Sequence, residues 1–256
     1  LRSLDAAQQC RAAPVSSTLG IFEPSHLRVQ STMQVLIVGS GKLATELVSE
    51  LSLDAPLMVR RWSDSSTTPG SSVVVHAGSG RELDDVIAYC QETNSALIEL
   101  ATGSKLEIAS PKFPVVLCPN TNILMLKFMN MLASGGKLFK GYHIEVTESH
   151  QAEKRSAPGT AIAIAQSLGL CANDVVSVRD TEKQLTTLSI PAEHLGRHAV
   201  HAIFIEDAVC RISLETRVYG ASPYADGVSK IVSAVTSRQL ENRVYAIDEF
   251  IEHGWV

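Results

Sequence analysis

From residue 33 onward, short apolar runs alternate with amphipathic segments, a pattern typical of α/β proteins. The segment "QVLIVGSGKLATELVSEL" joins a run rich in β-branched residues to a Gly-Ser-Gly turn. After the turn, Leu43, Leu47 and Leu51 recur at the spacing of one helix face. We therefore predict a buried strand, a tight turn and a helix over residues 34–51.

Four later segments are also apolar: "PLMVRRW", "SSVVVHAGSG", "SALIELATGS" and "FPVVLCPNTN". The last three end in small or polar residues. Between "SSVVVHAGSG" and "SALIELATGS", the segment "RELDDVIAYCQE" predicts a helix. This repetition predicts a parallel, doubly wound sheet, in which ligands bind beyond the carboxyl ends of the strands.

The pattern changes after an apolar helix expected in "NILMLKFMNMLASGG". Strands are expected in "GYHIEVTES", "VVSVRD", "QLTTLSI", "HAVHAIFIE" and "AVCRISLETRV", with one helix, "SAPGTAIAIAQSLG", among them. Several strands with few helices predict a second, α+β domain with a mixed or antiparallel sheet. A last helix, in "YADGVSKIVSAVTSRQL", has an apolar stripe that we expect to pack near the first domain.

Residues 1–32 show no sustained hydrophobic period. Their apolar stretch "STLGIF" is shorter than the core of a secretory signal, although the arginines leave an organelle-targeting peptide as an alternative. We interpret the segment as an N-terminal extension or as a tail introduced by the expression vector.

Composition limits the class of protein. With 256 residues and 45% hydrophobic content, the chain can bury a sizeable core in one large or two smaller domains. A net charge of -5 provides no basic field for nucleic acid or a membrane surface, and no apolar run is long enough to cross a bilayer. Five scattered cysteines without a CxxC pair disfavour a disulfide framework or a thiolate zinc site. We therefore expect a soluble, cytoplasmic protein.

The Gly-Ser-Gly turn is a candidate nucleotide site. Gly39 and Gly41 allow the chain to turn sharply, and the helix that follows presents backbone amides, those of Lys42 and Leu43 among them, to a pyrophosphate. Ala44 stands where a third small residue lets helix and strand pack closely. Many such turns bind no ligand, but the strand before and the helix after supply the context that the motif requires.

The end of the second strand favours NADPH as the coenzyme. Arg60 and Arg61 stand where a carboxylate would bind the ribose hydroxyls of NADH, and an arginine there can pair with the extra phosphate of NADPH. Both arginines could instead merely solvate an edge strand, which leaves NADH as the alternative. Later strand ends add cofactor-side candidates, namely His76, Ala101, Thr102, Gly103, Pro119 and Asn120.

Candidate catalytic groups gather in "EVTESHQAEKRSAPGTA", residues 145–161. If the strand ends near residue 149 and a helix begins near Pro158, His150 and Lys154 lie in the loop between them. A lysine and a histidine suit proton delivery to a substrate while hydride arrives from a nicotinamide. Gly159 and Thr160 at the helix start can hold a carboxylate. These parts predict reduction of an anionic unsaturated substrate, whereas a His and a Lys in a polar loop are more often only solvated.

The same segment resembles the signature of the bacterial dihydrodipicolinate reductases (4-hydroxy-tetrahydrodipicolinate reductases), which runs from Glu-x-His-His through Lys to Pro-Ser-Gly-Thr-Ala. "VLIVGSGKLA", "ATGS", "CPNTNI" and "YADGVSKIVSAV" are similar to further motifs of that family in the same order. The resemblance implies a Rossmann-like domain over residues 33–121 with 222–256, and a substrate-binding and oligomerisation domain over residues 122–221. It also implies assembly into a homo-tetramer or homo-dimer.

Carried over by position, His150 matches the family's catalytic histidine and Lys154 its proton donor. Gln151, Gly159 and Thr160 fall in its substrate clamp. The implied activity is NAD(P)H-dependent reduction of dihydrodipicolinate, a cyclic imine or enamine carboxylate, in lysine and diaminopimelate biosynthesis.

Several clamp positions depart from the family. Gln151 replaces a second histidine, Ser156 replaces an aspartate, and one residue is missing between Pro158 and Gly159. The segment "LSIPAEHLGRH" also lacks the arginine that the family usually carries just before the following Gly, although Arg197 lies near. These changes surround the dicarboxylate more than the hydride path.

Other functions compete with this hypothesis. A paralogue could reduce another imine or enamine acid, and a non-catalytic nucleotide-binding protein could keep the fold. Zinc is disfavoured although His194, His198 and His201 are suggestively spaced, because in a strand the last two would face opposite sides. We therefore expect an oxidoreductase without a metal.

Overall fold

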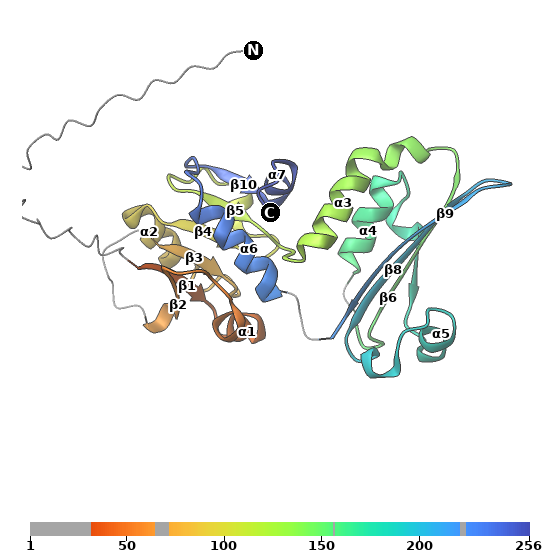
Figure 1. Ribbon diagram of the computed structural model, residues 1–256, viewed down its shortest axis with the longest axis horizontal. Coiled ribbons are helices and arrows are strands. Elements are labelled where there is room, and N and C mark those ends of the chain that lie inside the picture. The colour runs from red at the N-terminus through yellow and green to blue at the C-terminus, as the bar shows by residue number, and fades with distance from the viewer. Residues whose placement is uncertain (1–31, 65–71, 156, 221–223) are drawn as a thin grey trace, which may run out of the picture. The chain divides into compact units, whose positions relative to one another are not determined.

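The computed structural model describes residues 32–64, 72–155, 157–220 and 224–256. The predicted extension lies, except for Thr32, outside the described residues, as does Ser156 of the altered clamp. The remaining chain forms two β-sheets with helices (Figure 1).

The first sheet is entirely parallel and has the order β10-β5-β4-β3-β1-β2. Its strands are β1 (Met33–Val38), β2 (Leu57–Arg61), β3 (Val73–His76), β4 (Ala96–Glu99), β5 (Val115–Leu117) and β10 (Val244–Ala246). The continuous apolar runs form these strands because helices cover both faces of the sheet. The predicted Rossmann-like, doubly wound parallel sheet is confirmed.

Helices of this part fall on the two faces of the sheet. They are α1 (Lys42–Glu50), α2 (Leu83–Thr93), α6 (Tyr224–Thr236) and α7 (Ile247–Glu252). One apolar core joins α1, α6 and α7 to alternate residues of the central strands, such as Val35 and Ile37. The intervening residues, such as Leu36 and Val38, pack with α2 in the other core.

The second sheet is mixed, as expected, with the order β7-β6-β8-β9. Strand β6 (His143–His150) pairs in parallel with β7 (Val175–Val178) and antiparallel with β8 (His198–Glu206), which pairs antiparallel with β9 (Arg211–Tyr219). Helices α3 (Ile123–Gly135) and α4 (Gly159–Ser167) pack on this sheet through Leu132 and Ile164 (Figure 1). Most of β9 is exposed.

One local prediction is wrong, and one short strand was not predicted. The strand expected over residues 184–190 is wrong, because residues Thr181–Thr186 form helix α5. Asp180 caps this helix by accepting a hydrogen bond from the backbone N–H of Lys183 at 2.8 Å. In addition, no strand was expected at β10, a three-residue segment too short to show a period.

Short 3₁₀ helices connect several elements: Trp62–Asp64, Lys105–Ile108, Gly136–Phe139, Ala172–Asp174 and Ala192–His194. No helix in the described part of the chain has the length and apolar composition needed to span a membrane.

Candidate functional site

The glycine turn between β1 and α1 has the geometry of an anion site. Gly39 has a φ of 120°, and a Cβ there would lie 2.8 Å from the carbonyl oxygen of Ala77, so this position requires glycine. Gly41 caps α1 and has open space beside it, since a Cβ at this residue would meet no atom within 4 Å. The turn therefore leaves room for a phosphate at the positive end of α1.

Cofactor-side candidates meet in two adjoining hollows that share Gly78 and Ser79. Gly39 and Gly41 line one hollow. The other is lined by His76, Ala101, Thr102, Gly103 and Pro119. Most of the strand ends that the sequence predicted to converge thus do so. Lys42 and Leu43 open helix α1 without lining either hollow, and Asn120 also lines neither hollow.

The two arginines close the edge strand β2. Arg61 aligns with Ile37 of β1, two residues before Gly39, so it stands at the end of the sheet that carries the glycine turn. Arg60 is exposed and Arg61 is half-buried. Both positions are compatible with a phosphate on the adenosine side of a nucleotide.

A buried acid that sequence reasoning missed braces the cofactor side. Glu99 and His76 are fully buried, and their side chains meet with 2.8 Å between Oε1 and Nδ1. Glu99 also accepts hydrogen bonds from the backbone N–H of Ala101 at 2.9 Å and from the hydroxyl of Ser104 at 3.2 Å. Because these bonds fix the start of the loop after β4, Glu99 shapes one wall of the hollow. Its signal in the sequence was an acid inside an apolar strand.

A further cavity of about 410 Å³, which shares Pro119 with the second hollow, contains the candidate catalytic residues. It is lined by Pro119, Asn120, Asn122, Met125, His150, Gln151, Lys154, Thr160, Arg197, His198, Ala199, His201, Val218, Gly220 and Tyr224. His150 ends β6 rather than lying in the following loop, whereas Lys154 is in that loop as expected. Gly159 begins α4 but does not line the cavity.

The charge of this cavity has one sign. Lys154 and Arg197 supply cations, and no Asp or Glu is among the described residues that line it. The cavity therefore favours an anion locally, in a chain that is acidic as a whole.

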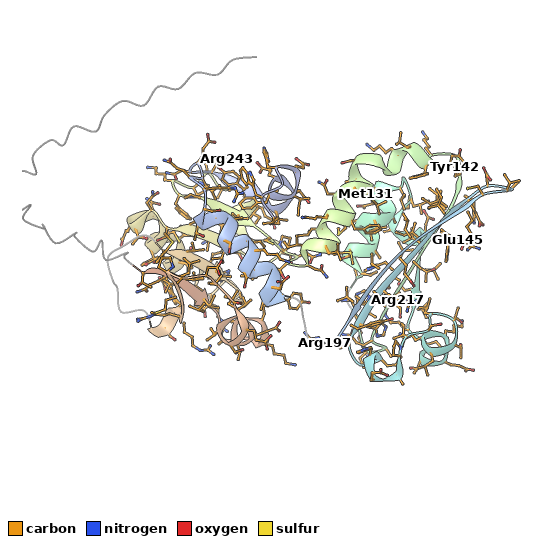
Figure 2. All side chains as sticks on the ribbon, viewed as in Figure 1. Met131, Tyr142, Glu145, Arg197, Arg217 and Arg243 are labelled. Carbon is orange, nitrogen blue, oxygen red and sulfur yellow. The ribbon has the colours of Figure 1, made fainter. Side chains whose placement is uncertain are left out.

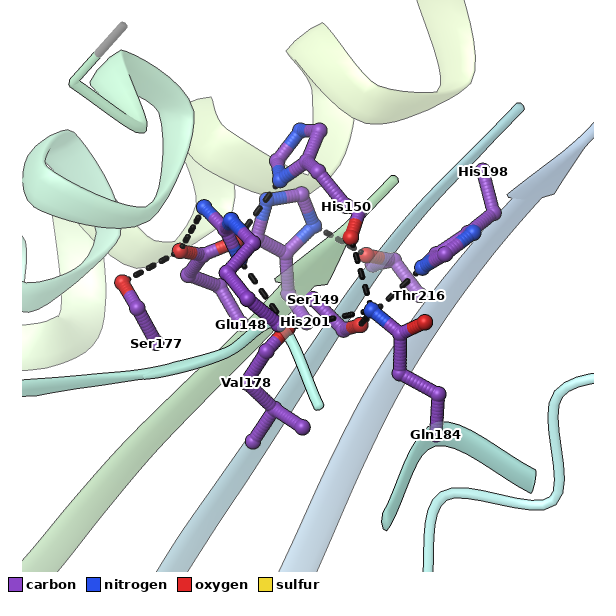
Figure 3. Close-up of polar contacts among 10 residues, drawn as sticks. Glu148, Ser149, His150, Ser177, Val178, Gln184, His198, His201 and Thr216 are labelled. Atoms are coloured by element: carbon purple, nitrogen blue, oxygen red, sulfur yellow. Dashed lines mark hydrogen bonds and ion pairs between the residues drawn. The ribbon is translucent and has the colours of Figure 1, made fainter. Parts of the chain in front are cut away.

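A buried carboxylate orients His150 (Figure 3). Glu148 Oε2 lies 2.7 Å from Nδ1 of His150, and Arg179 donates to both oxygens of the same carboxylate, at 2.7 and 3.1 Å. The hydroxyl of Ser177 donates to Oε1. Burial alone would raise the pKa of Glu148, but the hydrogen bonds from His150, Arg179 and Ser177 outweigh it and lower the pKa to about 2.

The ionised state of Glu148 determines the tautomer of His150. An ionised carboxylate can only accept, so the proton on the His150 ring lies on Nδ1. Nε2 is then the nitrogen that can exchange a proton with a bound molecule.

Behind this histidine, Gln184 holds the ends of two strands together. Its side-chain amide donates to the carbonyl of His150 at 2.8 Å and also reaches the carbonyl of Val178 at 3.2 Å. Ser149 Oγ lies 3.0 Å from Nε2 of His198, whose pKa is lowered by burial. The end of β6 is therefore rigidly positioned (Figure 3).

His201 is the second histidine ring beside His150. The two ring centroids are 6.0 Å apart and the planes are nearly perpendicular. Nδ1 of His201 lies 2.9 Å from the hydroxyl of Thr216 on β9. Burial, reinforced by the neighbouring imidazole of His150, lowers the pKa of His201 to about 4, so the His201 ring is neutral at neutral pH.

The rings of the three histidines considered for zinc make different side-chain contacts. The ring of His194 stacks on Tyr219, with centroids 4.7 Å apart, while His198 contacts Ser149 and His201 contacts Thr216. Within the described ranges, no group of three or more His, Cys, Asp or Glu side chains is arranged to hold a metal ion.

Sequence reasoning named His150 and Lys154 but missed the groups that support them. Glu148 and His150 are two apart in a strand and so share a face, which was a usable signal. Arg179 directly follows β7 and His201 lies in β8, and nothing local in the sequence connects them to His150.

Comparison with known proteins supports one family. The model of the family described as "Dihydrodipicolinate reductase, C-terminus" matches residues 122–251. The chain is 42% identical over 96 residues to "Probable 4-hydroxy-tetrahydrodipicolinate reductase 1, chloroplastic" of Oryza sativa subsp. japonica, covering 35% of this chain and 28% of the relative. It is 32% identical over 126 residues to "4-hydroxy-tetrahydrodipicolinate reductase 2, chloroplastic" of Arabidopsis thaliana, covering 45% of this chain and 36% of the relative. The matches thus span about a third of these plant relatives.

One solved structure has a similar fold over most of the chain. It is a dipicolinate-bound dihydrodipicolinate reductase from Paenisporosarcina sp. TG-14, with a TM-score of 0.58 and 17% identity. The similarity covers 85% of this chain and 99% of that one.

Proposed function

Because the chain belongs to the dihydrodipicolinate reductase family, we propose that it catalyses the NAD(P)H-dependent reduction of dihydrodipicolinate (4-hydroxy-tetrahydrodipicolinate). The product would enter lysine and diaminopimelate biosynthesis. One observation carries the proposal: His150, Lys154 and Thr160 line one cavity that has cationic and no acidic side chains among its described lining residues. A small cyclic carboxylate suits such a cavity.

The coenzyme site fits a dinucleotide. The open space beside Gly41 leaves room for the pyrophosphate, which the N-terminus of α1 would hold. The hollow lined by Ala101, Thr102 and Gly103 continues from that turn through the shared Gly78. When bound, the coenzyme supplies hydride. Arg60 and Arg61 would contact the extra phosphate of NADPH, which makes NADPH the proposed coenzyme.

The side chains of the second cavity handle protons and position the substrate. Lys154 is half-buried, and its ammonium group would donate the proton that balances hydride addition. His150 is held by Glu148 and would orient the reacting ring through Nε2. Thr160, in the first turn of α4, would hold one carboxylate of the substrate through its hydroxyl and its backbone N–H.

The active form is proposed to be a homo-tetramer or homo-dimer. A cytoplasmic location remains our prediction, although the rice and Arabidopsis relatives are named as chloroplastic.

A coupled assay tests the proposal. Purified protein is mixed with NADPH or NADH, and the substrate is generated in place by the preceding enzyme of the lysine pathway. Loss of the nicotinamide absorbance, dependent on the protein and on that enzyme, is the expected result. Coenzyme binding without turnover would contradict it and favour a paralogue that reduces another imine or enamine acid. The replacement at Gln151, which lines the cavity, is the observation that makes this second candidate specific.

A further inference from the structure

One residue that lines the substrate cavity carries a buried hydrogen-bonding atom that has no partner among the described residues. Nε2 of His201 is buried and forms no hydrogen bond within the described part of the protein. The residue nevertheless lines the cavity, although only 1% of its surface is exposed. Leaving such a group unpaired costs free energy, so a ligand that supplies a partner would be favoured.

The register of the second sheet fixes the position of this ring. His201 on β8 lies opposite Glu148 on β6 and opposite Thr216 on β9, so the three residues form a row across the sheet. Thr216 holds Nδ1 of His201, and the ring stands beside His150 (Figure 3). The imidazole is therefore held in place next to the proposed catalytic histidine.

The direction of the hydrogen bond to Thr216 and the position of the proton on the His201 ring are linked. In the described structure, the Thr216 hydroxyl has no side-chain or backbone acceptor other than Nδ1 of His201. If the hydroxyl donates to Nδ1, the proton of the neutral ring lies on Nε2. Nε2–H is then a donor without an acceptor, which suits an anion.

The altered clamp explains why a donor is needed here. A dicarboxylate substrate has one carboxylate for Thr160 and the start of α4, and a second that the family clamp would hold with residues changed in this chain. Lys154 and Arg197 supply charge around the same cavity, but Arg197 is exposed. His201 is the buried donor still without a partner among the described lining residues.

We propose that His201 is a specificity-determining residue of this chain that donates a hydrogen bond from Nε2 to the second carboxylate of the substrate. The inference rests on the proposed function, from which it takes the dicarboxylate character of the substrate. It adds a neutral contact that replaces part of the altered clamp.

Binding of two small acids tests the inference. Pyridine-2,6-dicarboxylate and pyridine-2-carboxylate are titrated calorimetrically into the parent protein and into His201→Leu, with coenzyme present. We expect His201→Leu to bind the dicarboxylate at least about tenfold more weakly and the monocarboxylate equally well. His201→Gln, which retains a donor, should recover part of the loss. Unchanged dicarboxylate binding in His201→Leu would overturn the inference.

A matched control and a second measurement separate this contact from a structural role. His143→Leu makes the same change on β6 at an exposed position outside the cavity, and should bind both acids normally. Nitrogen NMR of the parent at neutral pH should show His201 as the Nε2-protonated tautomer, with its signals identified by their loss in His201→Gln. An Nδ1-protonated ring would overturn the inference even if His201→Leu fails to fold.

The outcome is distinguishable from failure of the proposed function. A parent that binds the dicarboxylate through His201 but shows no turnover in the coupled assay supports the contact and contradicts the reaction. A parent protein that shows turnover, with a His201→Leu variant that binds the dicarboxylate normally, supports the reaction and contradicts the contact.

Discussion

Replacing Glu148 by glutamine should destabilise the protein in a pH-dependent way. The carboxylate is fully buried and pairs with Arg179 and His150. An amide of the same shape carries no charge, so both partners lose a charge-assisted hydrogen bond. The Arg179 side chain is only 24% exposed, so removing the carboxylate leaves a charge that water compensates only in part, which is more costly than losing an exposed pair.

The magnitude follows from the pKa of Glu148. A pKa lowered from 4.5 to about 2 in the folded protein corresponds to about 3 kcal/mol of stability at neutral pH. Because the folded-state pKa is depressed, this stability is complete above the unfolded-state pKa and is lost as the pH falls toward 2. We therefore expect Glu148→Gln to lower the free energy of unfolding by about 3 kcal/mol at pH 7 and to lower Tm by about 6–12 °C.

Urea denaturation between pH 7 and pH 3 measures this difference. More than half of the gap between parent and variant should disappear by about pH 3. Glu145→Gln is the matched control, because it makes the same change on the same strand (Figure 2). The side chain of Glu145 is 55% exposed. The control should stay within about 0.5 kcal/mol of the parent. A difference in the free energy of unfolding between parent and Glu148→Gln that stays constant across this pH range would refute the reasoning.

Three further outcomes are expected. Lys154→Ala should lower kcat at least about a hundredfold, while the coenzyme affinity measured by fluorescence titration should stay within about twofold of the parent. A variant that keeps the turnover rate of the parent would show that Lys154 is not part of the mechanism. Arg60→Ala combined with Arg61→Ala should remove most of the preference for NADPH, and equal affinities of the parent for NADPH and NADH would contradict the coenzyme assignment. Gly227→Ala should destabilise α6 by about 1–3 kcal/mol or more, because its Cβ would overlap the carbonyl oxygen of Thr121, and an unchanged Tm would contradict this packing.

The first sheet was predictable because its signals are local. Most of its strands are β-branched or otherwise apolar runs of a type that a covered parallel sheet uses, and the glycine turn marks where the ligand side begins. The prediction of a strand over residues 184–190 was wrong, also for a local reason. A short segment with alternating polarity also fits a helix when a preceding residue such as Asp180 caps it.

The candidate site was only partly accessible from sequence. His150 and Lys154 are four residues apart, so one motif contains both. Arg179, which directly follows β7, and His201 on β8 reach the same site through pairings whose register no local pattern specifies. The buried Glu99 likewise gains its meaning only when β3 and β4 align it with His76.

The return of the chain to the first sheet has a consequence for synthesis on the ribosome. Strand β10 pairs with β5, although about 130 residues separate them. At ~5–20 residues per second, the edge of β5 stays unpaired for roughly 6–25 s after it is made, and α6 is also missing from the core for most of that time. The strands of the mixed sheet are all synthesised within that interval and can pair first. The first sheet, whose strand β1 is made before all the others, would then be completed last. Until then its open edge is of the kind that nascent-chain chaperones are suited to cover.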